Sequence, residues 1–375
     1  AGGRGFYALD ITDPTQPRAL WETCADATIC SGVNHEPEMG LSFGNPQFGT
    51  WRNAANEERW VVFLTSGYNN IPDVDGVASG SGKGYIFVVD VATGAVLKAV
   101  GTNSGDTATP SGLAKITAIT ADPNGDPLVS YVYGGDNLGQ MWRFDFTSPG
   151  TVRVVKMGDA GATQPVTTRP DVTLCAVDGS TAPQRVVLFG TGRLLDVPDT
   201  TNADVQSLYA LKDTGASVNV RGAAMEQQTL STAGAGTNTS SYQITDAAAD
   251  LKLKSGWYFD WRLNPGERMN IDPKIVSGVA NVVTNLPTSS SSCSVGGTSN
   301  AYAVDVCRGV GVNGLVVGGT LSNTSAAVGF IIVRLPSGQL KMIATTAKGE
   351  TLTRPIVELD SEGAHPVGWR RVKGD

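Results

Sequence analysis

The chain has 375 residues, among them 46 glycines and 19 prolines, and a formal net charge of -7. The negative charge argues against nucleic acids and acidic membrane surfaces as partners, because both bind basic patches. No segment approaches the ~20 consecutive apolar residues of a membrane-spanning helix. A chain of this length usually forms about two or three domains. Repeated blades can instead build one long unit, and we expect a single domain over residues 1–375.

A hairpin unit recurs along the chain and predicts the fold. Each copy has an apolar run, a glycine-rich turn, a strand of the form aromatic-x-x-Asp, and a return strand. The copies begin at Gly3, Gly82, Gly139, Ser207, Gly256, Asn300 and Val328. This spacing, about 54 residues a copy, is near the ~40–50 residues of a propeller blade, with the excess in insertions at 222–240 and 285–299. Scattered glycine and proline predict an all-β fold, and only residues 245–254, with Asp246 as their cap, have the pattern of a helical turn or two.

The five cysteines indicate whether the protein works in an oxidising or a reducing compartment. Cys24 and Cys30 are close in the chain, as are Cys293 and Cys307, so that each pair closes a local loop. We therefore expect disulfides Cys24–Cys30 and Cys293–Cys307, an unpaired Cys175, and export to an oxidising compartment. The alternative is a set of buried thiols in a cytosolic protein, which the surface-like stretch TSSSSCSVGGTSN disfavours.

The chain offers little material for catalysis. It has two histidines, His35 and His365, so a Ser-His-Asp or Cys-His site is not expected. His35 lies among acidic residues near Cys30, where a metal role is conceivable, but a loop histidine bonded to backbone is favoured. The glycines around Lys83 lead into a strand, so they lack the helix N-terminus of a phosphate site. We expect no enzyme.

Residues 121–146 carry the most informative pattern. Oxygen-bearing side chains stand at every second position of a tight turn, at Asp122, Asn124 and Asp126. This pattern is typical of a site for a hard cation. The following strands, 128–133 and 140–146, predict half of a propeller blade. The alternative for the turn is an Asn-Gly hairpin with solvated aspartates and no ion. A second acidic loop, 69–76, could also hold an ion, but a surface turn is favoured there.

The order of motifs along the whole chain resembles the C-terminal domain of PilY/PilC-type proteins from the tip of bacterial type IV pili. The matching motifs are FYALDITDP, WVVFLTSGYNN, GYIFVVDVATG, DPNGD, YVYGGDNLGQMWRFD, VVLFGTGRLLD, GERMNIDP and the closing HPVGWR. The resemblance implies a modified, seven-bladed, quinoprotein-like β-propeller at the C-terminal end of a longer exported protein. It also implies a role in pilus assembly and retraction, twitching motility and adhesion to host or abiotic surfaces. Its partners would be pilins or minor pilins, at the outer membrane, cell surface and pilus tip after transit through the periplasm.

The resemblance also implies calcium binding in the acidic turn. The family's loop supplies oxygens at its positions 1, 3, 5, 7 and 9. In this sequence these positions are Asp122, Asn124, Asp126, the backbone carbonyl of Leu128, and Ser130. Ser130 stands where the family usually has an aspartate, so the loop carries one negative charge fewer. Because ligand charge tunes calcium affinity over orders of magnitude, the departure predicts weak or absent binding.

Two alternatives share the predicted fold. Quinone-dependent dehydrogenases of the pyrroloquinoline type have similar blade hairpins, such as FVVDVATGAVL, but the adjacent cysteines and the cofactor acid of those enzymes are missing here. A carbohydrate- or protein-binding propeller without a pilus role stays open, because fold alone does not choose a ligand. The terminal Lys373-Gly374-Asp375 resembles a variant integrin-binding tripeptide. We expect most tryptophans to pack between blades.

Overall fold

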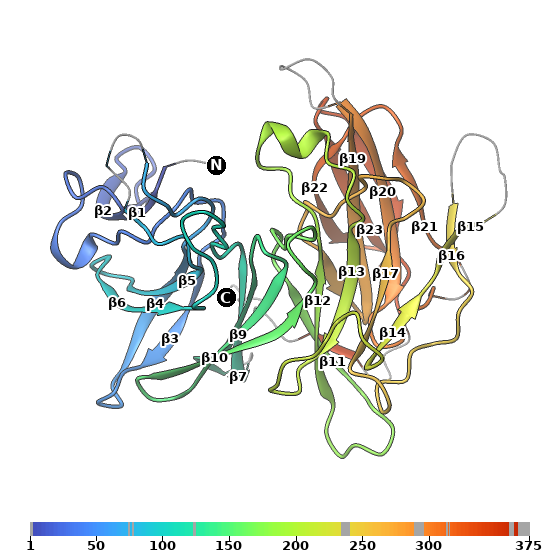
Figure 1. Cartoon of the computed structure of the whole chain (residues 1–375), viewed down its shortest axis with the longest axis horizontal. Coiled ribbons are helices and arrows are strands. Elements are labelled where there is room, and N and C mark those ends of the chain that lie inside the picture. The colour runs from blue at the N-terminus through green and yellow to red at the C-terminus, as the bar shows by residue number, and fades with distance from the viewer. Residues whose placement is uncertain are drawn as a thin grey trace. The chain divides into compact units, whose positions relative to one another are not determined.

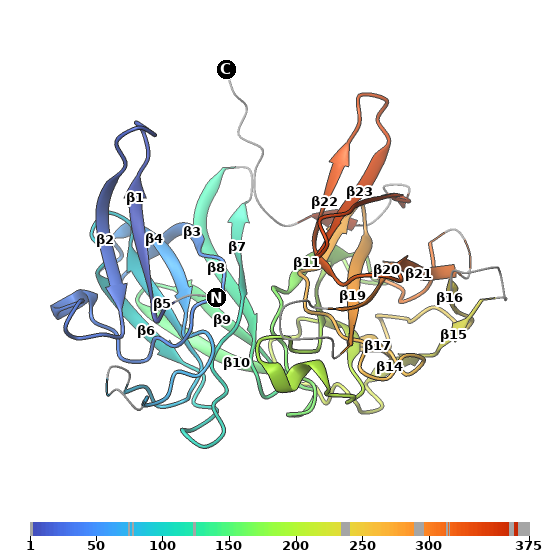
Figure 2. The ribbon, with the colours of Figure 1, turned by 90° about the horizontal axis from the view of Figure 1, so that it is seen from above.

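The computed structural model describes residues 3–73, 76, 79–122, 125–233, 241–288, 296–312, 314, 316–359 and 364–366. Strands dominate these residues (Figures 1 and 2), and their two 3-10 helices have three and four residues. The predicted all-β class is confirmed. None of the helices in this part of the chain is long and apolar enough to cross a membrane.

Contacts divide the chain into two compact units, and the first comprises the described residues up to Asp159. It contains a two-stranded hairpin and two four-stranded meanders, β3–β6 and β7–β10, joined where Thr50 of β3 pairs with Leu128 of β8. Its elements are β1 (Gly5–Asp10), β2 (Arg18–Cys24), η1 (Gly32–Asn34), β3 (Gln47–Arg52), β4 (Glu58–Thr65), β5 (Tyr85–Asp90), β6 (Val96–Gly101), β7 (Ile116–Asp122), β8 (Asp126–Gly135), β9 (Gln140–Ser148) and β10 (Thr151–Asp159).

Both faces of the β3–β6 meander are buried. Val61 and Phe63 of β4 pack with Trp51 and residues of the β7–β10 meander. The alternate residues Val62 and Leu64 face the other side, because successive side chains of a strand point in opposite directions. There they pack against the β1–β2 hairpin. Burial on both faces explains the continuous apolar run from Val61 to Leu64.

The second unit comprises the described residues from Ala160 to Val367. One meander has the order β11-β12-β13-β17, with β14 parallel to β17 and β25 paired with β11. A second has the order β18-β19-β20-β21, extended by β16 and β15, and β22–β24 form a small sheet. The elements are β11 (Asp171–Cys175), β12 (Gln184–Gly190), η2 (Val197–Thr200), β13 (Ser207–Lys212), β14 (Met225–Gln228), β15 (Leu230–Thr232), β16 (Ser241–Ile244), β17 (Gly256–Asp260), β18 (Lys274–Val276), β19 (Val279–Thr288), β20 (Gly296–Asp305), β21 (Val316–Ser322), β22 (Ala327–Arg334), β23 (Leu340–Thr346), β24 (Thr351–Pro355) and β25 (Ala364–Pro366).

Aromatic side chains fill the core of the second unit. Phe189, Tyr209 and Tyr258 lie opposite one another on β12, β13 and β17, and their rings stack at 5.0 and 5.6 Å between centroids. On the opposite face of β17, Trp257 and Phe259 pack against the β18–β21 meander. Of the tryptophans expected to pack, Trp51, Trp142, Trp257 and Trp261 are buried, Trp21 is half-buried and Trp60 is 60% exposed. Trp369 lies outside the described residues.

Five of the seven predicted hairpins form, namely β1–β2, β5–β6, β9–β10, β20–β21 and β22–β23. The predictions at Ser207 and Gly256 were wrong about pairing. Their strands, β13 and β17, pair with each other across the residues that carry β14, β15 and β16. Each of them therefore has a partner remote in sequence, and neither has a local return strand.

The other local expectations also need correction. Residues 245–254 contain one turn, in which Leu253 and Lys254 donate to the carbonyl of Asp250, and no helix. Asp246 caps no helix and accepts from the backbone of Thr229. The expected insertions at 222–240 and 285–299 carry β14, β15 and the paired ends of β19 and β20.

One predicted disulfide is confirmed and the other was wrong. Cys24 pairs with Cys30. Cys307 pairs with Cys175, 132 residues away, with 5.6 Å between their Cα atoms, and Cys293 lies outside the described residues. Cys175 ends β11 and Cys307 follows β20. The two meanders pack against one shared core, so the fold brings together cysteines that the spacing places far apart.

The described residues form four meanders of four strands and two smaller sheets. Four-stranded antiparallel meanders are the blades of a propeller. The count of seven blades and the single-domain extent over residues 1–375 stay predictions.

Candidate functional site

The acidic turn connects β7 to β8. Asp122 and Asp126 lie opposite each other at its base, and the amide of Gly125 donates to the Asp122 carbonyl at 3.3 Å. The carboxylate of Asp126 accepts from the amide of Leu128 at 2.9 Å. Asn124 lies outside the described residues. The structure therefore places the two predicted aspartates opposite each other at the base of the turn.

The remaining predicted ligands lie within β8. Leu128 pairs with Thr50 of β3, and Ser130 lies four residues beyond Asp126 in the same strand. At ~3.3 Å a residue, the Cα atoms of Asp126 and Ser130 are on the order of 13 Å apart. Ser130 is thus not brought to the turn. The two aspartates fit part of a calcium site, and Ser130 in this strand does not complete it.

An acidic side chain at the opposite end of β8, in the turn to β9, is structural. Asp136 is fully buried between β8 and β9, and it accepts from the amides of Leu138 at 3.0 Å and Gln140 at 2.9 Å. Its other oxygen accepts from the indole nitrogen of Trp142 at 2.8 Å. Burial raises the pKa of Asp136 to about 7, although these donors oppose the shift. The side chain fixes the glycine turn of the GGDNLGQMW motif.

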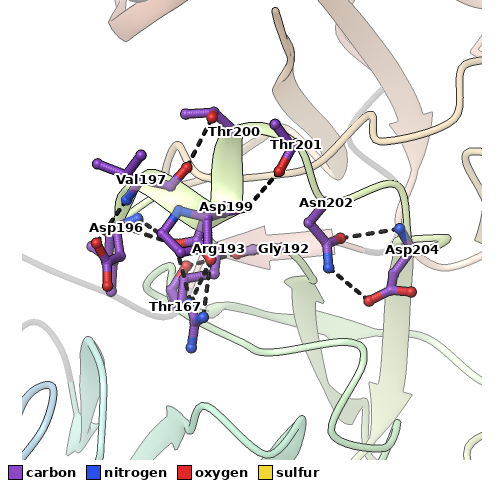
Figure 3. Close-up of polar contacts among 12 residues, drawn as sticks. Thr167, Gly192, Arg193, Asp196, Val197, Asp199, Thr200, Thr201, Asn202 and Asp204 are labelled. Carbon is purple, nitrogen blue, oxygen red and sulfur yellow. Dashed lines mark hydrogen bonds and ion pairs between the residues drawn. The ribbon is translucent and has the colours of Figure 1, made fainter. Parts of the chain in front are cut away.

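A polar network of side chains and backbone groups holds the loop between β12 and β13 (Figure 3). Asp196 begins the short helix η2 by accepting from the amide of Val197 at 2.7 Å. Asp199 is buried and accepts from the guanidinium of Arg193 and from the amides of Leu195 and Asp196, all at 2.9–3.1 Å. One carboxylate thus holds a side chain and two backbone positions of the same loop.

Arg268 holds this loop from the neighbouring segment. It is 2% exposed, and its guanidinium donates to the carbonyls of Gly266 at 2.9 Å and Arg193 at 3.0 Å, and to those of Asp199 and Asn202. Burial lowers the pKa of Arg268, while the charges of Asp199 and Asp204 oppose the shift. Burying a cation among carbonyls costs desolvation free energy. The bonds that Arg268 makes in return fix the backbone of this loop.

A pocket of about 80 Å³ lies beside the loop. Its lining is mainly polar and consists of Ala162, Thr163, Pro165, Arg193, Asp199, Asn202, Asp204, Gln206 and Arg268. The volume corresponds to about two or three water molecules, far below the ~300–1,000 Å³ of sites for drug-sized ligands. The pocket suits hydration or one small polar group.

The other sequence candidates have structural partners. His35 lies 3.1 Å from the Ala25 carbonyl. In the glycine-rich loop before β5, the carboxylate of Glu38 accepts from the amide and hydroxyl of Ser81 at 2.8 and 3.0 Å. That loop already holds an internal anion. Around the second acidic loop, Arg4 donates to the Asn69 carbonyl at 2.6 Å and lies 3.7 Å from Asp73, while residues 74–75 and 77–78 lie outside the described part.

One group with the spacing of metal ligands occurs in the described part of the chain. It comprises Glu22, Cys24 and Cys30. The two cysteines form a disulfide, so they offer no thiolate to a metal.

Comparison with known proteins supplies the family. The model of the PilY1 β-propeller domain matches residues 1–241. The type IV pilus biogenesis factor PilY1 of Pseudomonas aeruginosa is 27% identical over 358 residues, covering 82% of this chain and 28% of the relative. A PilY1 homolog of Xylella fastidiosa is 26% identical over 339 residues, covering 82% of this chain and 21% of the relative. The chain thus spans less than a third of either relative.

The crystal structure of the Pseudomonas aeruginosa PilY1 C-terminal domain has a similar fold, with a TM-score of 0.69. The match covers 94% of this chain and 78% of that one, at 24% identity. Together with the blade-like meanders, these matches confirm the predicted propeller fold. The family model matches more than half of the sequence, and the chain belongs to the PilY1 β-propeller family.

Proposed function

We propose that this chain is a non-enzymatic module of a pilus-tip-associated protein that supports type IV pilus assembly and controls retraction. The observation that carries the proposal is the match of residues 1–241 to the PilY1 β-propeller domain. The curated relatives that are named type IV pilus biogenesis factors support it. Twitching motility and adhesion to host or abiotic surfaces follow as consequences of that role.

The chemistry of the buried polar groups supports a non-enzymatic role. Ser207 has the neighbours closest to those of a nucleophile, since its hydroxyl donates to Asp260 at 2.6 Å. That hydroxyl also accepts from Arg221 and Gln164, both at 2.8 Å, and no histidine contacts it among the described residues. The acceptor, Asp260, is already ion-paired with Arg221 at 2.7 Å and with Arg262 at 2.9 Å, so the hydroxyl belongs to a structural network and lacks the histidine base of a Ser-His-Asp site.

The proposed partners are pilins or minor pilins, at the outer membrane, cell surface and pilus tip. The two disulfides, Cys24–Cys30 and Cys175–Cys307, support passage through an oxidising compartment such as the periplasm.

Deletion of the gene for the full-length protein in the producing bacterium tests the proposal. We expect the number of surface pili, counted by electron microscopy, to fall strongly and to recover when the full-length gene is returned. Normal piliation and normal twitching in the deletion strain would contradict the proposed role.

Calcium regulation through the acidic turn is part of the proposal, and it makes a prediction. We expect weak calcium binding, preferred over magnesium because an irregular turn suits the flexible geometry of calcium. Asp126→Ala should abolish it, since Asp126 and Asp122 form the base of the turn. In the proposed bound form the start of β8 leaves the ladder and brings position 130 to the ion, so Ser130→Asp should tighten binding by about tenfold or more. Isothermal titration calorimetry measures all three proteins.

Asp106→Ala is the matched control for calcium. Asp106 is also an exposed turn aspartate of the first unit, with its carboxylate bonded to the amides of Ala108 and Thr109. Its replacement should leave any calcium heat unchanged. Absence of heat from both the parent and Ser130→Asp would mean that the turn is an ion-free hairpin.

A further inference from the structure

The loop that Arg268 and Asp199 hold presents apolar side chains to solvent. At its tip Leu195 is 38% exposed and Val197 is 79% exposed, next to the exposed Asp196 and Pro198. Figure 3 shows Asp196 and Val197 at the end of the loop that lies away from Asn202 and Asp204. Single exposed apolar residues are common on surfaces. Here, however, they stand on a backbone that is fixed at many points.

The polar network fixes the tip on both sides. Asp199 binds the amides of Leu195 and Asp196, and the hydroxyl of Thr200 donates to the Val197 carbonyl at 2.8 Å. Arg268 binds the carbonyls at the two ends of the same segment, those of Arg193 and Asn202. An element that is ordered before binding loses less conformational entropy when it binds. The network therefore favours association through this tip.

The charge of this loop indicates which side chains a partner would present to it. The loop and its anchor carry three acidic side chains, Asp196, Asp199 and Asp204, against two basic ones, Arg193 and Arg268, a net charge of -1. Asp199 is paired with Arg193 at 2.9 Å, and Asp204 lies in the field of Arg268. Asp196 has no ion pair within the described part of the chain. The unbalanced negative charge is thus at the tip, beside Val197.

We infer that residues 195–204 are a preorganised docking element for a protein partner with an apolar hollow bordered by lysine or arginine side chains. Leu195 and Val197 enter the hollow, and Asp196 pairs with the basic border. The inference rests on the proposed function, which makes the partner a pilin or a minor pilin. Complementary charge at the rim of an interface chiefly speeds association and makes it sensitive to salt.

The test uses the full-length protein and the purified soluble domains of the pilin and minor pilins of the same bacterium. We expect one of these domains to bind in biolayer interferometry, with a Kd that Val197→Ser raises about tenfold or more. Asp196→Asn should raise the Kd at low salt and reduce its dependence on salt. The matched control is Leu253→Ser, because Leu253 is 77% exposed on a turn of the same unit. It should change the Kd less than about twofold.

The outcomes separate this inference from the proposed function. Equal binding by the parent and Val197→Ser, or an equal loss with Leu253→Ser, would overturn the docking element while the pilus role stands. The same holds if no pilin domain binds although deletion of the gene abolishes piliation. Normal piliation after deletion would refute the proposed function itself. In cells, Val197→Ser should restore fewer pili than Leu253→Ser at equal protein level.

Discussion

Replacing Glu267 with alanine should lower the free energy of unfolding of the second unit by about 3–5 kcal/mol. Glu267 is 1% exposed in the loop between β17 and β18. One of its oxygens accepts from the hydroxyls of Thr284 at 2.5 Å and Tyr302 at 2.7 Å and from the amide of Asn300 at 3.0 Å. The other accepts from the amide of Asn264 at 2.8 Å.

The large effect follows from what alanine leaves behind. Three buried donors on β19 and β20 and the half-buried amide of Asn264 would lose their acceptor. Each buried unsatisfied group costs about 1–3 kcal/mol, although such costs do not add fully. The carboxylate is also one reason, after burial, that the pKa of Tyr302 is raised. Tyr302 belongs to the aromatic core, so the loss reaches the packing of the unit.

Glu267→Gln is the control, because glutamine keeps the size of the side chain and one acceptor oxygen. It should cost about 1–2 kcal/mol, since its amide nitrogen replaces one acceptor and opposes a donor. Urea denaturation, followed by the fluorescence of the buried Trp257 and Trp261, measures both variants. A loss below about 1 kcal/mol for alanine would show that the donors find other partners. Equal losses for the two variants would show that the acceptor oxygen kept by glutamine does not satisfy them.

Local hairpins could be predicted from the sequence because their information is local. In β5–β6 the aspartate that ends the first strand, Asp90, accepts from the amides of Ala92 and Thr93, and Gly94 follows with a φ of 72°. A positive φ of this size favours glycine. Adjacent residues therefore determine both the turn and the alternating strands, so the pairing of β5 with β6 could be predicted.

Non-local pairing could not be predicted in the same way. The adjacency of β13 and β17, and the disulfide between Cys175 and Cys307, depend on which sheets pack together. Closing a long loop costs only slightly more entropy than closing a shorter one. Proximity in the chain is therefore a weak guide, and it led to the wrong pairing of Cys307 with Cys293.

The candidate site shows a second limit. Oxygen-bearing side chains at every second position are typical of a calcium-binding turn, but the same spacing places residues on one face of a strand. Asp122 and Asp126 belong to the turn, whereas Ser130 belongs to the strand. That Arg268 and Asp199 fix the loop between β12 and β13 could not be predicted from the sequence. Their bonds depend on burial and on backbone groups, and neither produces a sequence motif.

Asp136 should make the stability of the first unit depend on pH. Its pKa in the folded protein is about 7, raised from 3.8 mainly by burial. Between about pH 4 and 7 the folded protein retains a proton that the unfolded chain has released. The contribution of Asp136 to the free energy of unfolding is therefore largest below about pH 4 and decreases as the pH rises through about 7, by at most about 1.4 kcal/mol per pH unit.

Comparison with Asp136→Asn isolates this contribution, because asparagine does not titrate and keeps an oxygen for the amides of Leu138 and Gln140. The difference in free energy of unfolding between the two proteins should shift in favour of the variant as the pH rises from about 5 to about 8. The other titrating groups are common to both proteins, so their contributions cancel. The indole proton of Trp142, bonded to Asp136 at 2.8 Å, should report the same midpoint by NMR in the parent. A difference that stays constant over this range would mean that the three donors keep the carboxylate charged despite its burial.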